Sequence, residues 1–407
     1  MRNTTGYLCG ALLLSGLVLA GIAAYVAAYV TMAAMLIGLT RGNAGFPRQI
    51  LPVYGIVVFG YALIVASLPF VYRSPVDLMA PLALLPLLLM PGVERLLGSA
   101  PRQFTAVTFA SLCLAGAALG VAAGIAEMLI LHPTRVGVWN NPIHFASLTM
   151  LLGFMALVGI PENPSRLRLL YLGGPLLGMG AALLSGSRGP VFAAGLMGLA
   201  SIPFLLLWAP RDRRPLAIVA AGMIALIVAL SALGRSRAAS VLEAIASIWQ
   251  NGLAGAGDVI RSAMYQSAQQ AFQQSPVFGH GYGQIMSAAI AVASPEQQEL
   301  MAGYDTLHSD IANFAVLAGS LGLLAYAAFI IAPLALLRAN PPAVRLGATI
   351  LSSGFFALGL TNGMFGLLPQ TVLYAMLLGC LCALASARPT ARANIAASLT
   401  EEEVSNG

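Results

Sequence analysis

The residues in this chain best suited to chemistry are one histidine and a few arginines that stand beside long apolar runs. His308 follows Asp305 and Thr306, either of which could cap a helix, and it precedes a hydrophobic stretch. We therefore expect His308 in the first turn of a helix that begins at about Leu307. The positive end of the helix dipole disfavours imidazolium, so the ring would stay neutral and could accept a proton. A capping or interfacial role is the alternative.

Two short connections rich in turn residues each contain an arginine. Arg188 lies in the segment 185–190 beside Ser187, and Arg135 lies in the segment 132–144. A guanidinium group presents a planar fork of donors that matches phosphate oxygens and stays charged at physiological pH. Both arginines therefore suit a lipid phosphate or diphosphate at a membrane boundary. Interfacial snorkelling or a salt bridge is the alternative.

A third arginine lies in an amphipathic segment. In the range 258–274, apolar residues recur at every fourth position. Arg261 and Tyr265 each follow one of these positions by one residue, so they lie beside the apolar face of the helix. We predict a helix that lies across the membrane surface and ends before Pro276. Arg261 either pairs with Asp258 or contacts a phosphate or a glycan.

The stretch after that helix, Pro276-Val-Phe-Gly-His-Gly-Tyr-Gly283, alternates three glycines with other residues. Glycine permits a positive φ and the close approach of another backbone. His280 in this stretch is either structural or catalytic. The glycine spacing does not follow a predicted strand, so it does not indicate a dinucleotide site.

The composition indicates a polytopic membrane protein. Of 407 residues, 59% are hydrophobic and 8% charged, and mean hydropathy is +0.86. The four cysteines lie in apolar runs and match neither a metal site nor a disulfide framework. The net charge of +6 comes from scattered arginines rather than a basic stripe, so we expect no nucleic-acid partner.

Apolar stretches of about 20 residues predict an all-α protein with about twelve transmembrane helices. Two short spans fit into residues 9–39. The others are predicted at 51–69, 76–90, 104–131, 143–160, 168–184, 190–208, 216–233, 308–332, 345–361 and 368–386.

These spans divide the chain into four regions. Residues 1–233 hold the first nine spans, 234–307 form one large, partly helical loop, 308–386 hold the last three spans, and 387–407 form a disordered cytoplasmic tail. With the N-terminus in the cytoplasm, most arginines lie inside, as the positive-inside rule requires, and the large loop lies outside. The arginines on the outer side are then Arg73, Arg135, Arg188, Arg235, Arg237 and Arg261.

Several short motifs follow one another between about Arg135 and Phe356. Their order and spacing resemble those of bacterial O-antigen ligases, which mature lipopolysaccharide and belong to the O-antigen ligase/polymerase superfamily. The single large loop before a late histidine agrees with this resemblance. In chain order the motifs are Asn141-Pro-Ile-His-Phe145, Ser185-Gly-Ser-Arg-Gly189, Arg261 leading through Tyr265 to Pro276-x-Phe-Gly-x-Gly281, and His308-Ser followed after nine residues by Gly319-x-x-Gly322.

The resemblance implies a membrane glycosyltransferase with a fold like that of the C-type glycosyltransferases. It would move a preassembled O-antigen glycan from undecaprenyl diphosphate to a sugar hydroxyl of lipid A-core. The active site would face the periplasm from the bacterial inner membrane and be open to membrane lipids. We expect no cofactor and no metal, because the acidic residues of the outer connections are scattered.

The resemblance also implies roles for individual residues. His308 would act as the general base and give inversion at the sugar carbon. Arginines would stabilise the diphosphate where other glycosyltransferases of this kind use a divalent cation. The diphosphate-binding candidates are Arg188, Arg135 and Arg261, and the secondary candidates are His280, Tyr265 and Ser187.

Two other function classes remain open. An O-antigen polymerase or a protein O-oligosaccharyltransferase would share the superfamily and the lipid donor but would use another acceptor. A secondary transporter would show internal repeats, paired broken helices and ionisable residues at mid-membrane. Glu127 is the main acidic residue within a predicted span, and it lies close to the end of that span.

Overall fold

The computed structural model describes residues 21–40, 47–98, 104–138, 141–208, 259–339 and 341–386, together with residues 214, 217, 218, 221 and 222. All regular secondary structure in these ranges is helical, as the sequence predicts. Most of the span predicted at 216–233, the first part of the large loop and the C-terminal tail lie outside the described residues.

Nine stretches of described helix are long and apolar enough to cross a membrane, and they coincide with nine of the predicted spans. A polytopic helical membrane protein is therefore confirmed, whereas the full count of spans stays a prediction. The helices are α2 (Gly21–Thr40), α3 (Leu51–Val71), η1 (Pro75–Leu78), α4 (Met79–Gly98), α5 (Ala106–Leu131), α6 (Pro142–Met155), η2 (Ala156–Gly159), η3 (Arg166–Leu172), α7 (Gly173–Ser185), α8 (Arg188–Trp208), α11 (Val259–Gln274), η6 (Tyr282–Gln284), α12 (Ile285–Val292), α13 (Pro295–Met301), α14 (Asp310–Ile331), η7 (Ala332–Arg338), α15 (Pro342–Thr361) and α16 (Leu368–Ser386).

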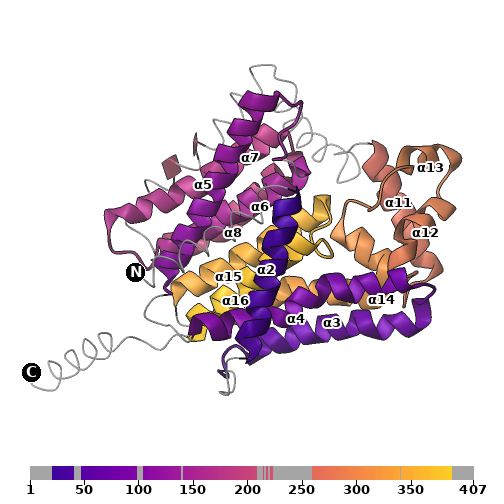
Figure 1. The fold of residues 1–407 in the computed structure, drawn as a ribbon, viewed down its shortest axis with the longest axis horizontal. Coiled ribbons are helices and arrows are strands. Elements are labelled where there is room, and N and C mark those ends of the chain that lie inside the picture. The colour runs from indigo at the N-terminus through magenta and orange to yellow at the C-terminus, as the bar shows by residue number, and fades with distance from the viewer. Residues whose placement is uncertain are drawn as a thin grey trace, which may run out of the picture.

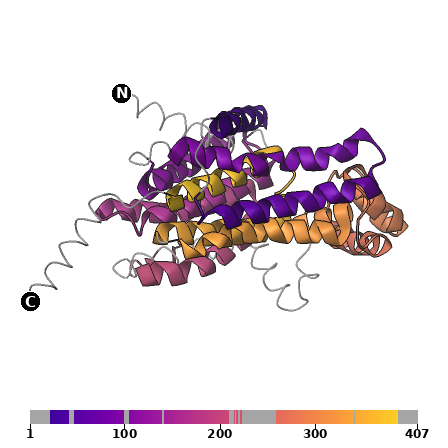
Figure 2. The same ribbon diagram turned by 90° about the horizontal axis from the view of Figure 1, so that it is seen from below.

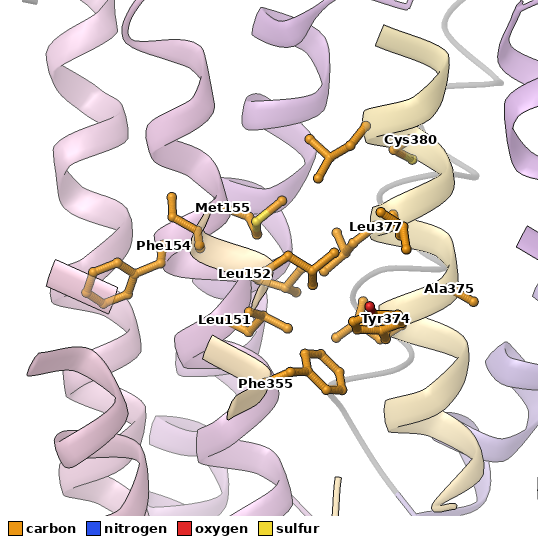
Figure 3. Close-up of a cluster of buried hydrophobic side chains, with 14 of the residues drawn as sticks. Leu151, Leu152, Phe154, Met155, Phe355, Tyr374, Ala375, Leu377 and Cys380 are labelled. Atoms are coloured by element: carbon orange, nitrogen blue, oxygen red, sulfur yellow. The ribbon is translucent and has the colours of Figure 1, made fainter. Parts of the chain in front are cut away.

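Helices α6, α15 and α16 contribute the most deeply buried part of the bundle. Leu151 and Leu152 of α6, Phe355 of α15 and Tyr374 of α16 belong to one buried cluster (Figure 3). Helices α6 and α16 are apolar on every side, which is the pattern of a helix surrounded by other helices. The remaining spans pack around them and expose apolar side chains on their outer faces.

Helix α14 is broken at Ala318 and Gly319, and the glycine-rich segment 276–281 fills the break. A break inside a membrane is tolerated only where protein satisfies the freed backbone groups. Four backbone hydrogen bonds do this here. The amide donors and carbonyl acceptors are Ser320 to Pro276 (2.8 Å), Leu321 to Val277 (3.4 Å), His280 to Val316 (2.8 Å) and Gly281 to Leu317 (3.0 Å).

Gly319→Ala is expected to destabilise the protein, because this position has both a left-handed backbone and a close neighbour. Its φ is +61°, and an added Cβ would lie 2.6 Å from the carbonyl carbon of Val277. We expect a loss of about 2–4 kcal/mol in unfolding free energy, seen as a lower thermal midpoint in detergent. Gly180→Ala in α7 is the control, because a Cβ there meets nothing within 4 Å. Equal midpoints for the two variants would contradict the prediction.

Helices α11, α12 and α13 gather at one end of the molecule, beside an end of α14 (Figures 1 and 2). The helix predicted at 258–274 is α11, and its position across the membrane surface stays a prediction. Met264 and Ala268 of α11 are buried in a small core that includes Met301 and Val316. The apolar face is therefore covered by protein, from α12, α13 and α14.

Candidate functional site

His308 lies just before α14 rather than in its first turn. Ser309 is the N-cap and the helix begins at Asp310, so the predicted start at Leu307 is wrong. The side-chain oxygen of Asn313 accepts a hydrogen bond from the Leu307 amide (3.0 Å), which fixes the chain in a turn ahead of the helix. His308 itself has a left-handed backbone with φ of +49°. The imidazole therefore belongs to a fixed turn and not to the helix.

Two tyrosines contact this turn. The Tyr265 hydroxyl of α11 lies 3.3 Å from the carbonyl oxygen of His308 and 3.2 Å from that of Leu360, so it can donate to both. Burial raises the pKa of Tyr265, an effect that the nearby Arg261 guanidinium partly opposes. The phenol therefore keeps its proton and remains a donor. The ring of Tyr304 meets the His308 ring edge-on, with centroids 5.5 Å apart.

A second histidine lies near the first. His144 is in the first turn of α6, close enough to His308 for the charges of the two rings to interact. In the sequence His144 belongs to the motif Asn141-Pro-Ile-His-Phe145, without a predicted role. The signal was its position two residues after Pro142, in the first turn of a helix that Asn141 caps with its side chain.

Arg135 is held against the turn that precedes Arg188. Its Nε donates to the carbonyl oxygen of Ser185 (2.9 Å) and its Nη2 donates to the hydroxyl of Ser187 (3.1 Å). The neighbouring amide of Val136 donates to the carbonyl of Leu184 (3.2 Å). The two predicted arginine motifs are thus side by side, and Ser187 supports Arg135.

Arg188 is the first residue of α8. Gly186, with φ of +61°, ends α7, and the amide of Ser187 returns to the carbonyl of Ala182 (3.2 Å) in a Schellman-type turn. The next residue, Arg188, is exposed, and within the described part of the chain its guanidinium makes no hydrogen bond or ion pair. A helix N-terminus favours a bound anion. Arg188 therefore combines a charged fork with such an end.

The end of α15 connects the turn before Arg188 to the turn that contains His308. Gly189 of α8 packs against Thr361, since an added Cβ would lie 2.3 Å from the Thr361 hydroxyl oxygen. The preceding carbonyl, of Leu360, accepts the hydrogen bond from Tyr265 that also reaches His308. The start of α8, the end of α15 and the turn before α14 therefore meet at one place.

Arg261 and His280 occupy different environments around this place. Arg261 is half-buried on α11, one helical turn before Tyr265. Its predicted pairing with Asp258 falls on a residue outside the described ranges. The His280 ring donates through Nε2 to the carbonyl of Ala271 (2.8 Å), and its backbone amide donates into the break of α14. This geometry fits the structural interpretation of His280.

Three buried carboxylates each accept hydrogen bonds from backbone amides. Asp310 accepts from the amides of Met364 (2.8 Å) and Phe365, and so fixes the start of α14 to the connection after α15. The other two carboxylates are Asp77, which accepts from the amides of Arg73, Ser74 and Gly283, and Glu127, which accepts from the amides of Gly137 and Val138.

Among the residues that the structure describes, no group of three or more His, Cys, Asp or Glu side chains could hold a metal ion.

A family model described as O-antigen ligase matches residues 174–327, a range that begins in α7 and ends within α14. The range includes Arg188, Arg261 and His308, whereas Arg135 and His144 precede it. No curated protein matches the chain.

Proposed function

We propose that this chain, which the match over residues 174–327 assigns to the O-antigen ligase/polymerase superfamily, is an O-antigen ligase. It transfers a preassembled O-antigen glycan from undecaprenyl diphosphate to a sugar hydroxyl of lipid A-core. The observation that carries the proposal is the meeting of the His308 turn and the Arg188 turn at Leu360 and Thr361. This meeting supports the proposal that a base, His308, and a phosphate-binding group, Arg188, serve one reacting centre.

The proposed reaction has one displacement step. The acceptor hydroxyl oxygen attacks C1 of the glycan as the bond between C1 and the phosphate oxygen breaks, which inverts the configuration at C1. His308 takes the proton of the hydroxyl. Undecaprenyl diphosphate leaves with the bonding electron pair, and the guanidinium of Arg188 with the helix N-terminus behind it stabilises the new negative charge. Arg135 and Arg261 supply further positive charge.

The proposed active site faces the periplasm from the inner membrane. The positive-inside distribution of arginines puts the connections of Arg135, Arg188 and Arg261 on the outer side. In support, contacts through Ser187, Thr361 and Tyr265 link these connections in space. Both substrates are lipids, so they would enter from the membrane rather than from solution.

The reaction is expected to proceed without a divalent cation. The leaving diphosphate would be stabilised by guanidinium groups, whose charge does not depend on a bound metal. Purified protein should keep its transfer rate in an excess of chelator, measured with a lipid-diphosphate donor and a lipid A-core acceptor. Inhibition that added Mg²⁺ or Mn²⁺ reverses would refute this expectation.

A gene deletion separates the ligase from its relatives in the superfamily. Loss of the ligase should remove all capped lipopolysaccharide while long lipid-linked polymer accumulates. Caps of a single repeat would instead identify a polymerase, and intact lipopolysaccharide with an unmodified glycoprotein would identify a protein O-oligosaccharyltransferase. The broken helix α14 argues against a transporter. In transporters a helix break lines the site of the substrate or ion, whereas here the backbone of residues 276–281 fills the break.

Glu127→Gln is expected to slow transfer by about tenfold, because Glu127 positions the loop that holds Arg135. Its carboxylate accepts hydrogen bonds from the amides of Gly137 and Val138. A neutral amide oxygen is the weaker acceptor, since hydrogen bonds to ionised groups are roughly twice as strong. The measurement is the transfer rate of purified protein, with the exposed Glu162→Gln as the control.

A double-mutant cycle tests whether Glu127 acts through Arg135. In an Arg135→Ala background, Glu127→Gln should cause little further loss, because the group that it positions is absent. If the two losses multiply instead, Glu127 acts through general stability and not through Arg135.

A further inference from the structure

Tyr304 is an exposed aromatic residue beside the candidate base. It lies in the connection between α13 and α14, outside the described helices that are long and apolar enough to cross a membrane, so a lipid-facing span does not explain its exposure. The residue is 38% exposed, and within the described part of the chain its hydroxyl makes no hydrogen bond. Its ring is therefore available to contact a ligand.

The rings of Tyr304 and His308 form a corner. Their centroids are 5.5 Å apart and their planes are nearly perpendicular, at 81°. One wall of the corner is an exposed aromatic ring, and the other is an imidazole that is half-buried. The two walls are closer together than the width of one sugar residue with its hydroxyl groups. A single sugar can therefore contact both.

The connection that carries both rings is anchored on either side of Tyr304. Met301 and Leu307 are fully buried in the small core that they share with residues of α11, α12 and α14. The amide of Tyr304 donates to the carbonyl of Met301 (3.2 Å), and the amide of Leu307 donates to the side chain of Asn313 (3.0 Å). The corner is thus formed before a ligand arrives, and a preformed surface loses less freedom on binding.

The chemistry of this corner suits a pyranose that has a hydroxyl group at its rim. One face of a pyranose presents C–H groups, which pack on the negative face of an aromatic ring. Its hydroxyl groups project from the rim, where they reach an adjacent acceptor. A neutral imidazole has one accepting nitrogen. An aromatic wall with one polar group that fixes orientation is typical of small-ligand sites.

The direction of the proposed reaction decides which substrate provides this sugar. In an inverting transfer, the attacking oxygen and the leaving group lie on opposite faces of the sugar ring at C1. The diphosphate is proposed to leave toward Arg188, whereas His308 has to contact the attacking hydroxyl, which belongs to the acceptor. A ring in contact with His308 therefore lies on the acceptor side of the reacting carbon.

We propose that Tyr304 stacks on the acceptor sugar that carries the attacking hydroxyl, and so orients that hydroxyl toward His308. This inference rests on the proposed glycan transfer and adds a residue that selects and positions the acceptor. Stacking requires an aromatic ring and not the phenolic hydroxyl. Phenylalanine should therefore replace Tyr304 without loss, whereas leucine should not.

The test compares Tyr304→Leu and Tyr304→Phe with Tyr72→Leu, all in the full-length protein in detergent. Tyr72 is the matched control because it is also an exposed tyrosine, at 53%, in the connection after α3. The probe is delipidated core oligosaccharide from the strain that carries the gene, in an equilibrium titration. Tyr304→Leu should bind it about two- to tenfold more weakly than wild type, the factor that one aromatic contact contributes. Tyr304→Phe and Tyr72→Leu should bind like wild type.

Transfer kinetics give a second readout. In Tyr304→Leu the KM for the acceptor should rise by the same factor, while the KM for the lipid donor stays at its wild-type value. The thermal midpoint should also stay at its wild-type value, because Tyr304 is exposed. A rise in the donor KM in place of the acceptor KM would overturn the assignment to the acceptor.

The binding results decide the inference independently of transfer. No binding of the oligosaccharide by wild type, or equal binding by wild type and Tyr304→Leu, overturns it. An equal loss in Tyr304→Phe and Tyr304→Leu also overturns it, because the hydroxyl and not the ring would then make the contact. Weaker binding by Tyr304→Leu alone, together with a wild-type protein that transfers no glycan, would refute the proposed function and leave the sugar contact supported.

Discussion

His308→Asn is expected to lower glycan transfer by about 10³-fold while the protein remains folded. General-base catalysis commonly contributes about 10²–10⁴-fold, and asparagine cannot accept the proton of the attacking hydroxyl. Asparagine is chosen because it tolerates the left-handed backbone that His308 adopts, with φ of +49°. His308→Ala should lose as much activity, but the left-handed position makes its folding harder to interpret. The measurement is the single-turnover transfer rate.

His132→Asn is a matched control for that variant. His132 is exposed, has a φ of +46° and lies in the connection after α5, so the same substitution is made in the same backbone conformation. Its transfer rate and thermal midpoint should equal those of wild type. A His308→Asn protein that still caps lipopolysaccharide normally would exclude the general-base role.

The membrane-spanning helices could be predicted from sequence because hydropathy and length alone define them. Predicted spans such as 51–69 and 368–386 agree with α3 and α16 to within a few residues. The start of α14 could not be predicted in this way. Asp305 and Thr306 are plausible caps, yet the chain stays non-helical to Ser309 because Asn313 accepts from the Leu307 amide.

The partner of an apolar helix face also cannot be predicted from one segment. The amphipathic pattern of α11 was read correctly as a helix, but the pattern is the same whether the apolar face meets lipid or protein. The apolar side chains that cover it include Ala289, Met301 and Val316, which lie on three other helices. Likewise, Gly319 was noted as part of a motif, whereas its function in the break of α14 depends on residues 276–281.

The candidate site was predicted in its residue types but not in its connections. Residue chemistry selected His308, Arg188 and Arg135, and a turn-rich setting selected the last two. The residues that join them, Leu360 and Thr361, make contact through a backbone carbonyl and a packing surface. Neither feature has a sequence signature. His144 was missed for a related reason, since its proximity to His308 arises only when α6 and the turn before α14 come together.

Arg188→Lys is expected to lower the transfer rate by about tenfold or more, and Arg188→Ala by about 10²–10³-fold, the usual cost of removing one group that stabilises developing charge. Lysine keeps the charge but loses the planar fork that binds two phosphate oxygens at once. Because Gly189 is packed against Thr361, the backbone at the start of α8 cannot easily shift to let a lysine compensate. The control is Arg338→Lys, an exposed arginine at the end of η7.

Separate measurements of kcat and KM show whether Arg188 stabilises only the transition state or also the bound substrate. If the guanidinium stabilises charge that develops as the diphosphate leaves, kcat should fall in Arg188→Lys while KM for the lipid donor changes little. If KM rises and kcat is unchanged, Arg188 holds the donor equally in the ground state and the transition state. A wild-type rate in Arg188→Lys would show that the fork is not needed. The positive charge at this position, which lysine keeps, would then be enough to stabilise the leaving group.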